Sequence, residues 1–357
     1  MITLLATVFV LGVLIFVHEV GHFLVAKLFK IKVERFSIGY PPRIAGKKIG
    51  ETDYCISAVP FGGYVKIAGM VDESLDEEKL KEEPKPWEFR SRSSIQKILV
   101  VMGGPLMNIG LAFIIYFVAT LNYGIPDISG PAYVGSVVPG NPAAEAGILP
   151  GDKIVAVNGR KVNTWDELAE IIHSSPGKPC KLNWMRHDSL FTAKVTPIKQ
   201  KIVDNGDIRE VGLIGISPKF RMKKVGIGTA FVNAGKTIYD LTHLVIISIV
   251  KLIEGKESIR SLAGPVFIAK MAGESARSGW GSLIGFLAFL SLDLGILNLF
   301  PIPALDGGHV MFLGVEAIIR KEIPLKVKLI IQQIGMFLLI ALMIFIVYND
   351  IIRLVHK

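Results

Sequence analysis

The sequence predicts an α-helical polytopic membrane protein with a small membrane-associated β-sheet and an inserted extracytoplasmic α+β domain. Hydrophobic residues make up 51% of the 357 residues, and mean hydropathy is positive, as is typical of integral membrane proteins. Four stretches are long enough to cross a bilayer as helices, and each holds at most one acidic residue. They are Ile2–Ala26, Ile98–Leu121, Ser282–Leu305 and Leu329–Asn349. The inserted domain is expected at 125–218, where short strand-like runs alternate with Gly/Pro turns and one helical stretch, 165–173.

The first span, within residues 1–30, contains His18, Glu19 and His22. Ionisable side chains inside a span are costly, so these residues need a function. Histidines at positions i and i+4 share one face of a helix, so both imidazoles can bind a single metal ion beside the glutamate. The alternative, an apolar helix with incidental polar residues, is disfavoured within a membrane. The stretch has no basic n-region and is too long for a cleavable signal peptide.

Residues 31–94 are expected to form a β-hairpin region followed by a charged linker from residue 71 onward. Candidate strands are 33–38, 53–59 and 63–68, and Phe61–Tyr64 is predicted to be a tight turn. This small sheet should lie near the histidine-bearing end of the first span. In the second span, within 95–122, Gly103-Gly104-Pro105 interrupts the start. These residues predict either close approach of another helix or a simple kink.

Residues 219–280 are predicted to form an amphipathic region at the membrane surface. Its clearest helix, 238–253, is short and carries Asp240, His243 and Lys251. Such a helix is more typical of the membrane surface than of a fifth span.

The net charge is +9, and the charge is not spread evenly. Lys and Arg residues recur in the connection between the first and second spans, and the short connection between the third and fourth spans carries Arg320, Lys321, Lys326 and Lys328. Short Lys/Arg-rich loops stay in the cytoplasm, so both termini and residues 125–218 are expected outside. Surface solvation explains these charges without any nucleic-acid partner. The two cysteines, Cys55 and Cys180, then lie on opposite sides of the membrane, and no disulfide is expected.

A catalytic zinc ion takes three protein ligands, so the histidine pair needs a partner. Asp306, in the third span region 281–310, is the candidate, because the charge-derived topology places it at the same membrane end as the histidines. Pro301 and Pro303 break the helix just before it, as a wet active site inside the membrane requires. An ordinary polar turn is the alternative for Asp306, and His309 is a competing ligand. The fourth span is expected within 327–350.

With both motifs in place, the chain resembles the site-two protease family of intramembrane zinc metallopeptidases, of the bacterial regulator-of-sigma-E type. The resemblance covers nearly the whole length, and residues 134–159 closely resemble a bacterial PDZ domain. A PDZ domain implies a groove where a peptide adds as an extra strand. The alternative, to which we give equal weight, is that the domain only covers the active site through its size. The segments that carry the resemblance are 18–22, 61–66, 103–108, 134–159, 262–265 and 298–308.

The resemblance implies one zinc ion bound by His18, His22 and Asp306, with Glu19 as the general base. It implies that Asn298 helps to hold the substrate extended, although a helix-packing role is the alternative, and that a β-hairpin at Gly62 and Gly63 presents the substrate. Where the family commonly has a second asparagine, this chain has Asp293, either protonated or solvated by the active-site cavity. It also has one PDZ-like unit where many relatives have two.

The implied activity is hydrolysis within transmembrane segments of single-span membrane proteins, such as an anti-sigma factor or signal-peptide remnants. The expected location is the bacterial inner membrane, in contact with the lipid bilayer, with the active site near the cytoplasmic side. Two other classes are open. A zinc carrier would need the histidines but not Glu19, and an inactive PDZ scaffold would have no chemical need for Glu19.

Overall fold

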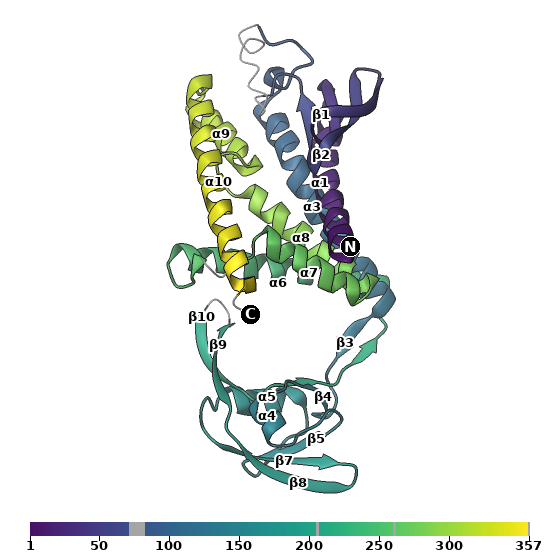
Figure 1. The fold of residues 1–357 in the computed structure, drawn as a ribbon, viewed down its shortest axis with the longest axis vertical. Coiled ribbons are helices and arrows are strands. Elements are labelled where there is room, and N and C mark those ends of the chain that lie inside the picture. The colour runs from purple at the N-terminus through teal and green to yellow at the C-terminus, as the bar shows by residue number, and fades with distance from the viewer. Residues whose placement is uncertain (71–82, 205–206, 260–261, 356–357) are drawn as a thin grey trace. The chain divides into compact units, whose positions relative to one another are not determined.

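A computed structural model describes residues 1–70, 83–204, 207–259 and 262–355. The first half of the predicted linker, 71–82, lies outside these ranges. The chain forms two compact units, one of residues 1–118 and 231–357 and the other of residues 119–230. Figure 1 labels the elements of both units.

Four helices in the described part of the chain are long and apolar enough to cross a membrane. They match the four predicted spans in order, with longer ends at α1, α3 and α10. Apolar side chains on all sides suit helices surrounded by lipid rather than water. The four are α1 (Ile2–Leu28), α3 (Ser94–Tyr123), α8 (Trp280–Leu299) and α10 (Leu325–Val355).

The third span is shorter than predicted. The predicted break at Pro301 and Pro303 is present: α8 ends at Leu299, before the predicted end at Leu305, and a separate helix, α9 (Asp306–Ile319), begins at Asp306. Pro301 and Pro303 explain the break, since proline cannot donate a backbone hydrogen bond and forces the preceding residue out of helical geometry. Residues 300–305 therefore form a non-helical connection (Figure 1).

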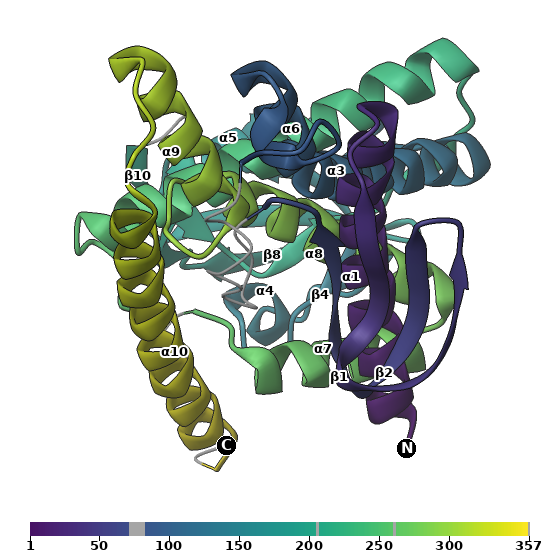
Figure 2. The same cartoon turned by 90° about the horizontal axis from the view of Figure 1, so that it is seen from above.

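The small sheet consists of two long antiparallel strands, β1 (Val33–Ile49) and β2 (Thr52–Ile67), which lie along α1 in both views (Figures 1 and 2). The first half of β1 has partners on both sides: Ile38 is paired with Gly63 and with Ile56. The predicted turn at Phe61–Tyr64 was wrong, because these residues lie within β2 and the turn is at residues 50 and 51.

Close packing, rather than a turn, explains the two glycines inside β2. A Cβ atom on Gly62 would lie 2.7 Å from Cδ2 of the Tyr40 ring. A Cβ on Gly63 would lie 3.3 Å from Ile15 and 3.4 Å from Cγ of Glu19, both on α1. Glycine in a strand often marks such close approach.

Helices α1 and α3 cross with their backbones in contact. A Cβ on Gly21 would lie 2.6 Å from the carbonyl carbon of Gly103, and a Cβ on Gly103 would lie 2.9 Å from that of Gly21. The predicted close approach at Gly103-Gly104 is therefore confirmed. Helix α3 continues through Pro105.

The amphipathic region contains two helices, α6 (Ile227–Ile253) and α7 (Pro265–Arg277). Helix α6 begins eleven residues earlier than the predicted 238–253, and it is not among the helices apolar enough to span. Helix α7 packs against α1. Its first turn is capped by Asp350 of α10, whose carboxylate accepts hydrogen bonds from the Gly264 N–H at 3.3 Å and the Phe267 N–H at 3.0 Å.

The unit of residues 119–230 is built around a four-stranded antiparallel sheet in the order β6-β5-β7-β8. The predicted helix at 165–173 is α5 (Trp165–His173), capped by the Thr164 side chain, and it contributes Leu168 to the core. The sheet strands are β5 (Lys153–Val157), β6 (Arg160–Lys161), β7 (Cys180–Arg186) and β8 (Ser189–Val195).

Three further strand pairs and a short helix complete this unit, and the hairpin of β9 with β10 was not predicted. The pairing of β3 with β12 joins the entering and leaving segments, which extends the unit beyond the predicted 125–218. The pairs are β3 (Ile125–Asp127) with β12 (Arg221–Lys223), β4 (Val134–Val137) with β11 (Ile216–Pro218) and β9 (Ile198–Asp204) with β10 (Asp207–Leu213), and the helix is α4 (Pro142–Glu145).

A buried ion pair stabilises this unit. Asp152 is only 1% exposed, and it accepts hydrogen bonds from Nε and Nη2 of Arg186, both at 2.8 Å, and from the Leu149 N–H at 2.8 Å. Burial acts to raise the pKa of Asp152, but the Arg186 and Leu149 hydrogen bonds outweigh it and hold the pKa below its usual value. Since the unfolded-state pKa is about 3.9, the stabilisation is present above about pH 4 and is lost as the pH falls through the lower folded-state pKa.

We expect Asp152→Asn to lower the free energy of unfolding of this unit by about 2 kcal/mol at pH 7, because charged hydrogen bonds become neutral or are lost. The difference from wild type should shrink below pH 4. Thermal unfolding of the full chain, followed by tryptophan fluorescence, measures both. Asp188→Asn, at an exposed position in the β7–β8 turn, is the control and should change little. Equal effects of the two substitutions on unfolding would contradict a stabilising role of the Asp152–Arg186 ion pair.

Candidate metal centre

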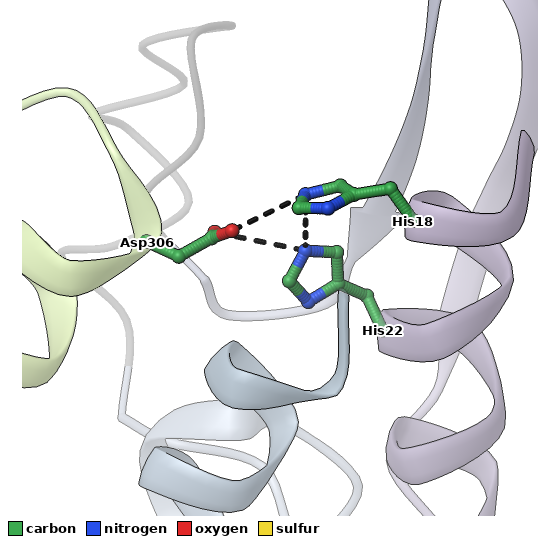
Figure 3. A group of neighbouring side chains, drawn as sticks. All are labelled: His18, His22 and Asp306. Carbon is green, nitrogen blue, oxygen red and sulfur yellow. Dashed lines mark hydrogen bonds and ion pairs between the residues drawn. The ribbon is translucent and has the colours of Figure 1, made fainter. Parts of the chain in front are cut away.

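Helix α1 places two imidazoles side by side. His18 and His22 are one turn apart on the same face, and their Nε2 atoms are 3.1 Å apart (Figure 3). The uncharged hydrophobic sequence around them keeps the helix regular, so their spacing is fixed by the helix itself. The side chains are 13% and 11% exposed.

Asp306 completes the group from the far end of the sequence. It is the first residue of α9, and the non-helical connection after α8 brings it to the histidines (Figure 3). Its Oδ2 lies 3.2 Å from Nε2 of His18, and its Oδ1 lies 3.6 Å from Nε2 of His22. One candidate ligand atom from each of the three residues falls within 4.8 Å of the others.

These distances fit one tetrahedral metal ion. Zinc–nitrogen and zinc–oxygen bonds of about 2.0–2.2 Å at tetrahedral angles separate ligand atoms by roughly 3.3–3.5 Å. The two histidine nitrogens are 3.1 Å apart, and each lies 3.2 or 3.6 Å from its nearer oxygen of the Asp306 carboxylate. Two imidazoles and one carboxylate are also a donor set that zinc uses in catalytic sites. The three residues can therefore hold a zinc ion with little movement.

The backbone of α3 orients one of the imidazoles. Nδ1 of His22 lies 2.9 Å from the carbonyl oxygen of Val100. A carbonyl can only accept, so Nδ1 carries the proton and Nε2 presents its lone pair. This is the usual arrangement of a metal-binding histidine.

Glu19 lies beside the group and interacts electrostatically with His18, His22 and Asp306. Its carboxylate accepts a hydrogen bond from the backbone N–H of Val65, in β2. Gly63, which the sequence also singled out, packs against Glu19, whereas Gly62 packs against the Tyr40 ring. The sheet thus runs directly past the carboxylate.

The other predicted site residues do not belong to the three-residue group. His309 is three residues beyond Asp306, but its Nε2 lies 3.0 Å from the side-chain nitrogen of Gln332 on α10. It is not part of the three-residue group. Asn298 and Asp293 are partly buried on α8, and no hydrogen bond within the described ranges joins either side chain to the group.

Two neighbouring residues of α3 were not predicted as site residues. A Cβ on Gly104 would lie 2.7 Å from Cε1 and 2.8 Å from Nε2 of His18, and closer still to Nε2 of His22. Asn108 is fully buried, with its Nδ2 3.5 Å from Nδ1 of His18. The run from Gly103 to Asn108 carried part of the family resemblance, but nothing in its pattern reveals which residues face the imidazoles.

Comparisons with known proteins agree with this chemistry. The model of peptidase family M50 matches residues 6–342. A provisionally named zinc metalloprotease of Clostridium perfringens is 37% identical over 345 residues, 95% of each chain. Zinc metalloprotease RasP of Bacillus licheniformis is 30% identical over 424 residues, 99% of each chain.

Among solved structures, the PDZ domain of an SdrC-like protein from Listeria monocytogenes is 25% identical, with a TM-score of 0.21, and covers 26% of this chain and 93% of that chain. The family match spans almost the whole sequence and includes both parts of the metal group. Four helices of this chain could also cross a membrane. The chain therefore belongs to peptidase family M50, the site-two protease family of zinc metalloproteases.

Proposed function

We propose that this zinc metalloprotease cleaves peptide bonds within, or at the cytoplasmic edge of, the transmembrane segments of single-span membrane proteins. The observation that carries the proposal is the position of His18, Glu19 and His22 in the second half of α1, a helix that can span the bilayer. Asp306 joins them from the break after α8, another such helix. A metal site on these helices acts on substrates in the membrane rather than in water.

His18, His22 and Asp306 would hold one zinc ion. Bound there, zinc supplies Lewis acidity, which acidifies a water molecule and polarises the scissile carbonyl. Glu19 accepts the proton of the attacking water and delivers it to the leaving amine nitrogen, so that the peptide bond breaks without a free amide anion. Its electrostatic interactions with the two histidines and Asp306 support this role.

Strand β2 would present the substrate. Peptide bonds in a helix are hydrogen bonded internally, so the cleaved segment must unwind, and its amide groups then need new partners inside the membrane. Residues 63–65 pair with β1 on one side, and no described strand pairs with their other edge. An unwound segment can add to that edge beside Glu19. Asn298 is expected to help to hold it extended.

The charge distribution supports an orientation in the bacterial inner membrane. The Lys/Arg-rich connections face the cytoplasm, and both termini and the PDZ-like unit face outward. The natural substrates we expect are anti-sigma-factor-like proteins or remnant signal peptides. The PDZ-like unit would admit only substrates already trimmed outside the membrane.

Cleavage of a model single-span substrate by the purified protein in lipid vesicles tests the activity. We expect a cut inside the transmembrane segment, mapped by mass spectrometry, and we expect loss of cleavage on chelation with recovery on adding zinc. Cleavage confined to the soluble part of the substrate, or insensitivity to chelation, would contradict the proposal. A zinc carrier is the competing function, and it predicts zinc flux into vesicles that persists in Glu19→Gln.

A separate experiment tests whether the PDZ-like unit excludes substrates with a large outer domain. A bulky folded domain fused to the outer end of the substrate is expected to block cleavage by the intact protein. Deletion of residues 125–218 should restore that cleavage. Equal cleavage of bulky and trimmed substrates by the intact protein would show that the PDZ-like unit does not act as a filter.

A further inference from the structure

The second ring nitrogen of each histidine has a different neighbour. Nδ1 of His22 faces the Val100 carbonyl oxygen, which can only accept a hydrogen bond. Nδ1 of His18 lies 3.5 Å from the side-chain amide of Asn108. An amide can donate or accept, so the orientation of Asn108 decides which nitrogen of His18 carries the proton.

The side-chain amide of Asn108 is fully buried, and only one of its two polar atoms has a partner. With Nδ2 toward His18, its Oδ1 has no hydrogen-bond partner in the described structure. A buried acceptor without a partner costs about 1–3 kcal/mol. The nitrogen and oxygen of an asparagine amide exchange places by a half-turn of the side chain. With Oδ1 toward His18, an Nδ1–H of that imidazole is the donor that Oδ1 lacks.

The backbone at Asn108 is firmly held. The hydroxyl of Ser291, on α8, donates a hydrogen bond of 2.8 Å to the Asn108 carbonyl oxygen, and Ser291 is also fully buried. The amide can therefore turn over while its backbone stays in place. This contact links α8 through α3 to His18 on α1.

We propose that Asn108 is a positioning residue, which accepts the Nδ1–H of His18 and so directs the Nε2 lone pair toward the metal. Nε2 is the ring nitrogen of His18 that faces Asp306, at 3.2 Å from its Oδ2. Binding of a metal by Nε2 requires the proton on Nδ1, and an acceptor oxygen of Asn108 stabilises that tautomer. Partners of this kind change metal affinity about 10–100-fold when removed. The inference rests on the metal site proposed above.

Two substitutions in the full chain separate this role from simple packing. Asn108→Leu has nearly the same shape but no acceptor, and we expect it to bind zinc about 10–100-fold more weakly. Asn108→Asp keeps an acceptor oxygen, and we expect affinity within a few-fold of wild type. Zinc affinity is measured by competition with a chromophoric chelator. The visible absorption of the Co²⁺-substituted protein should be altered in Asn108→Leu and retained in Asn108→Asp.

A purely structural role predicts the reverse order, because burying a carboxylate is costlier than burying leucine. Thr120→Val, at a buried polar position on the same helix, is the control and should leave zinc affinity unchanged. If Asn108→Leu binds zinc as tightly as wild type, or Asn108→Asp weakens binding as much as Asn108→Leu, the inference is overturned and the metal site stands. If wild type itself binds no zinc, both fail.

Discussion

Glu19→Gln is expected to bind zinc like the wild type and to lose proteolysis by about 10²–10⁴-fold or more, the usual contribution of a general base. Glutamine has nearly the shape of glutamate but cannot accept the proton of the attacking water. His18, His22 and Asp306 are untouched, so the ligand set is complete. Zinc content of the purified variant and its rate of cleavage of a single-span substrate measure the two effects separately.

Asp306→Ala is the matched comparison. It removes the carboxylate that lies 3.2 Å from His18 and 3.6 Å from His22, so zinc binding and proteolysis should fall together. The contrast between the two variants separates the base from the ligand. Proteolysis that survives in Glu19→Gln would show that another group removes the proton.

Gly104→Ala is expected to disable the metal site through a single methyl group. The added Cβ would lie 2.7–2.8 Å from two ring atoms of His18 and closer to Nε2 of His22. Both rings are held by one helix, and α3 is pressed backbone to backbone against that helix at Gly21 and Gly103. Because the two helix backbones cannot move apart, the imidazoles must rotate away from their positions. We expect zinc affinity to fall at least about 10-fold, by analogy with the loss of a ligand-orienting contact, and proteolysis to fall with it.

Gly110→Ala supplies the control for this experiment. Gly110 lies on the same helix, and a Cβ there meets no atom within 4 Å. Alanine at an open helical position is favoured over glycine by about 1 kcal/mol. Gly110→Ala should therefore leave zinc binding intact and fold at least as well as wild type. Equal zinc affinity in both alanine variants would exclude the predicted clash.

The membrane helices and the metal group were predictable because their signals are local or constrained by chemistry. A long apolar run specifies a span, and two histidines one turn apart specify a shared helix face. The charge bias of the connections and the need for a third ligand then selected Asp306, which lies beside both histidines.

The errors arose where tertiary packing overrides local preference. Gly62 and Gly63 are typical of a turn, but they lie in strand β2. Glycine is needed there because the Tyr40 ring and α1 occupy the space that a side chain would fill. Asn298 matched a family pattern, and its role in holding the substrate stays a prediction. Asn108 was missed as a site residue because its contact with His18 joins two helices 90 residues apart in sequence.

The break between α8 and α9 also bears on when the enzyme becomes active during its synthesis. His18, Glu19 and His22 are made first, within α1, whereas Asp306 is the first residue of α9 and follows the two helix-breaking prolines. If these residues act as proposed above, a nascent chain that ends before residue 306 holds two ligands and the base but has no third ligand. Such a chain would lack proteolytic activity until most of the protein has been translated and inserted.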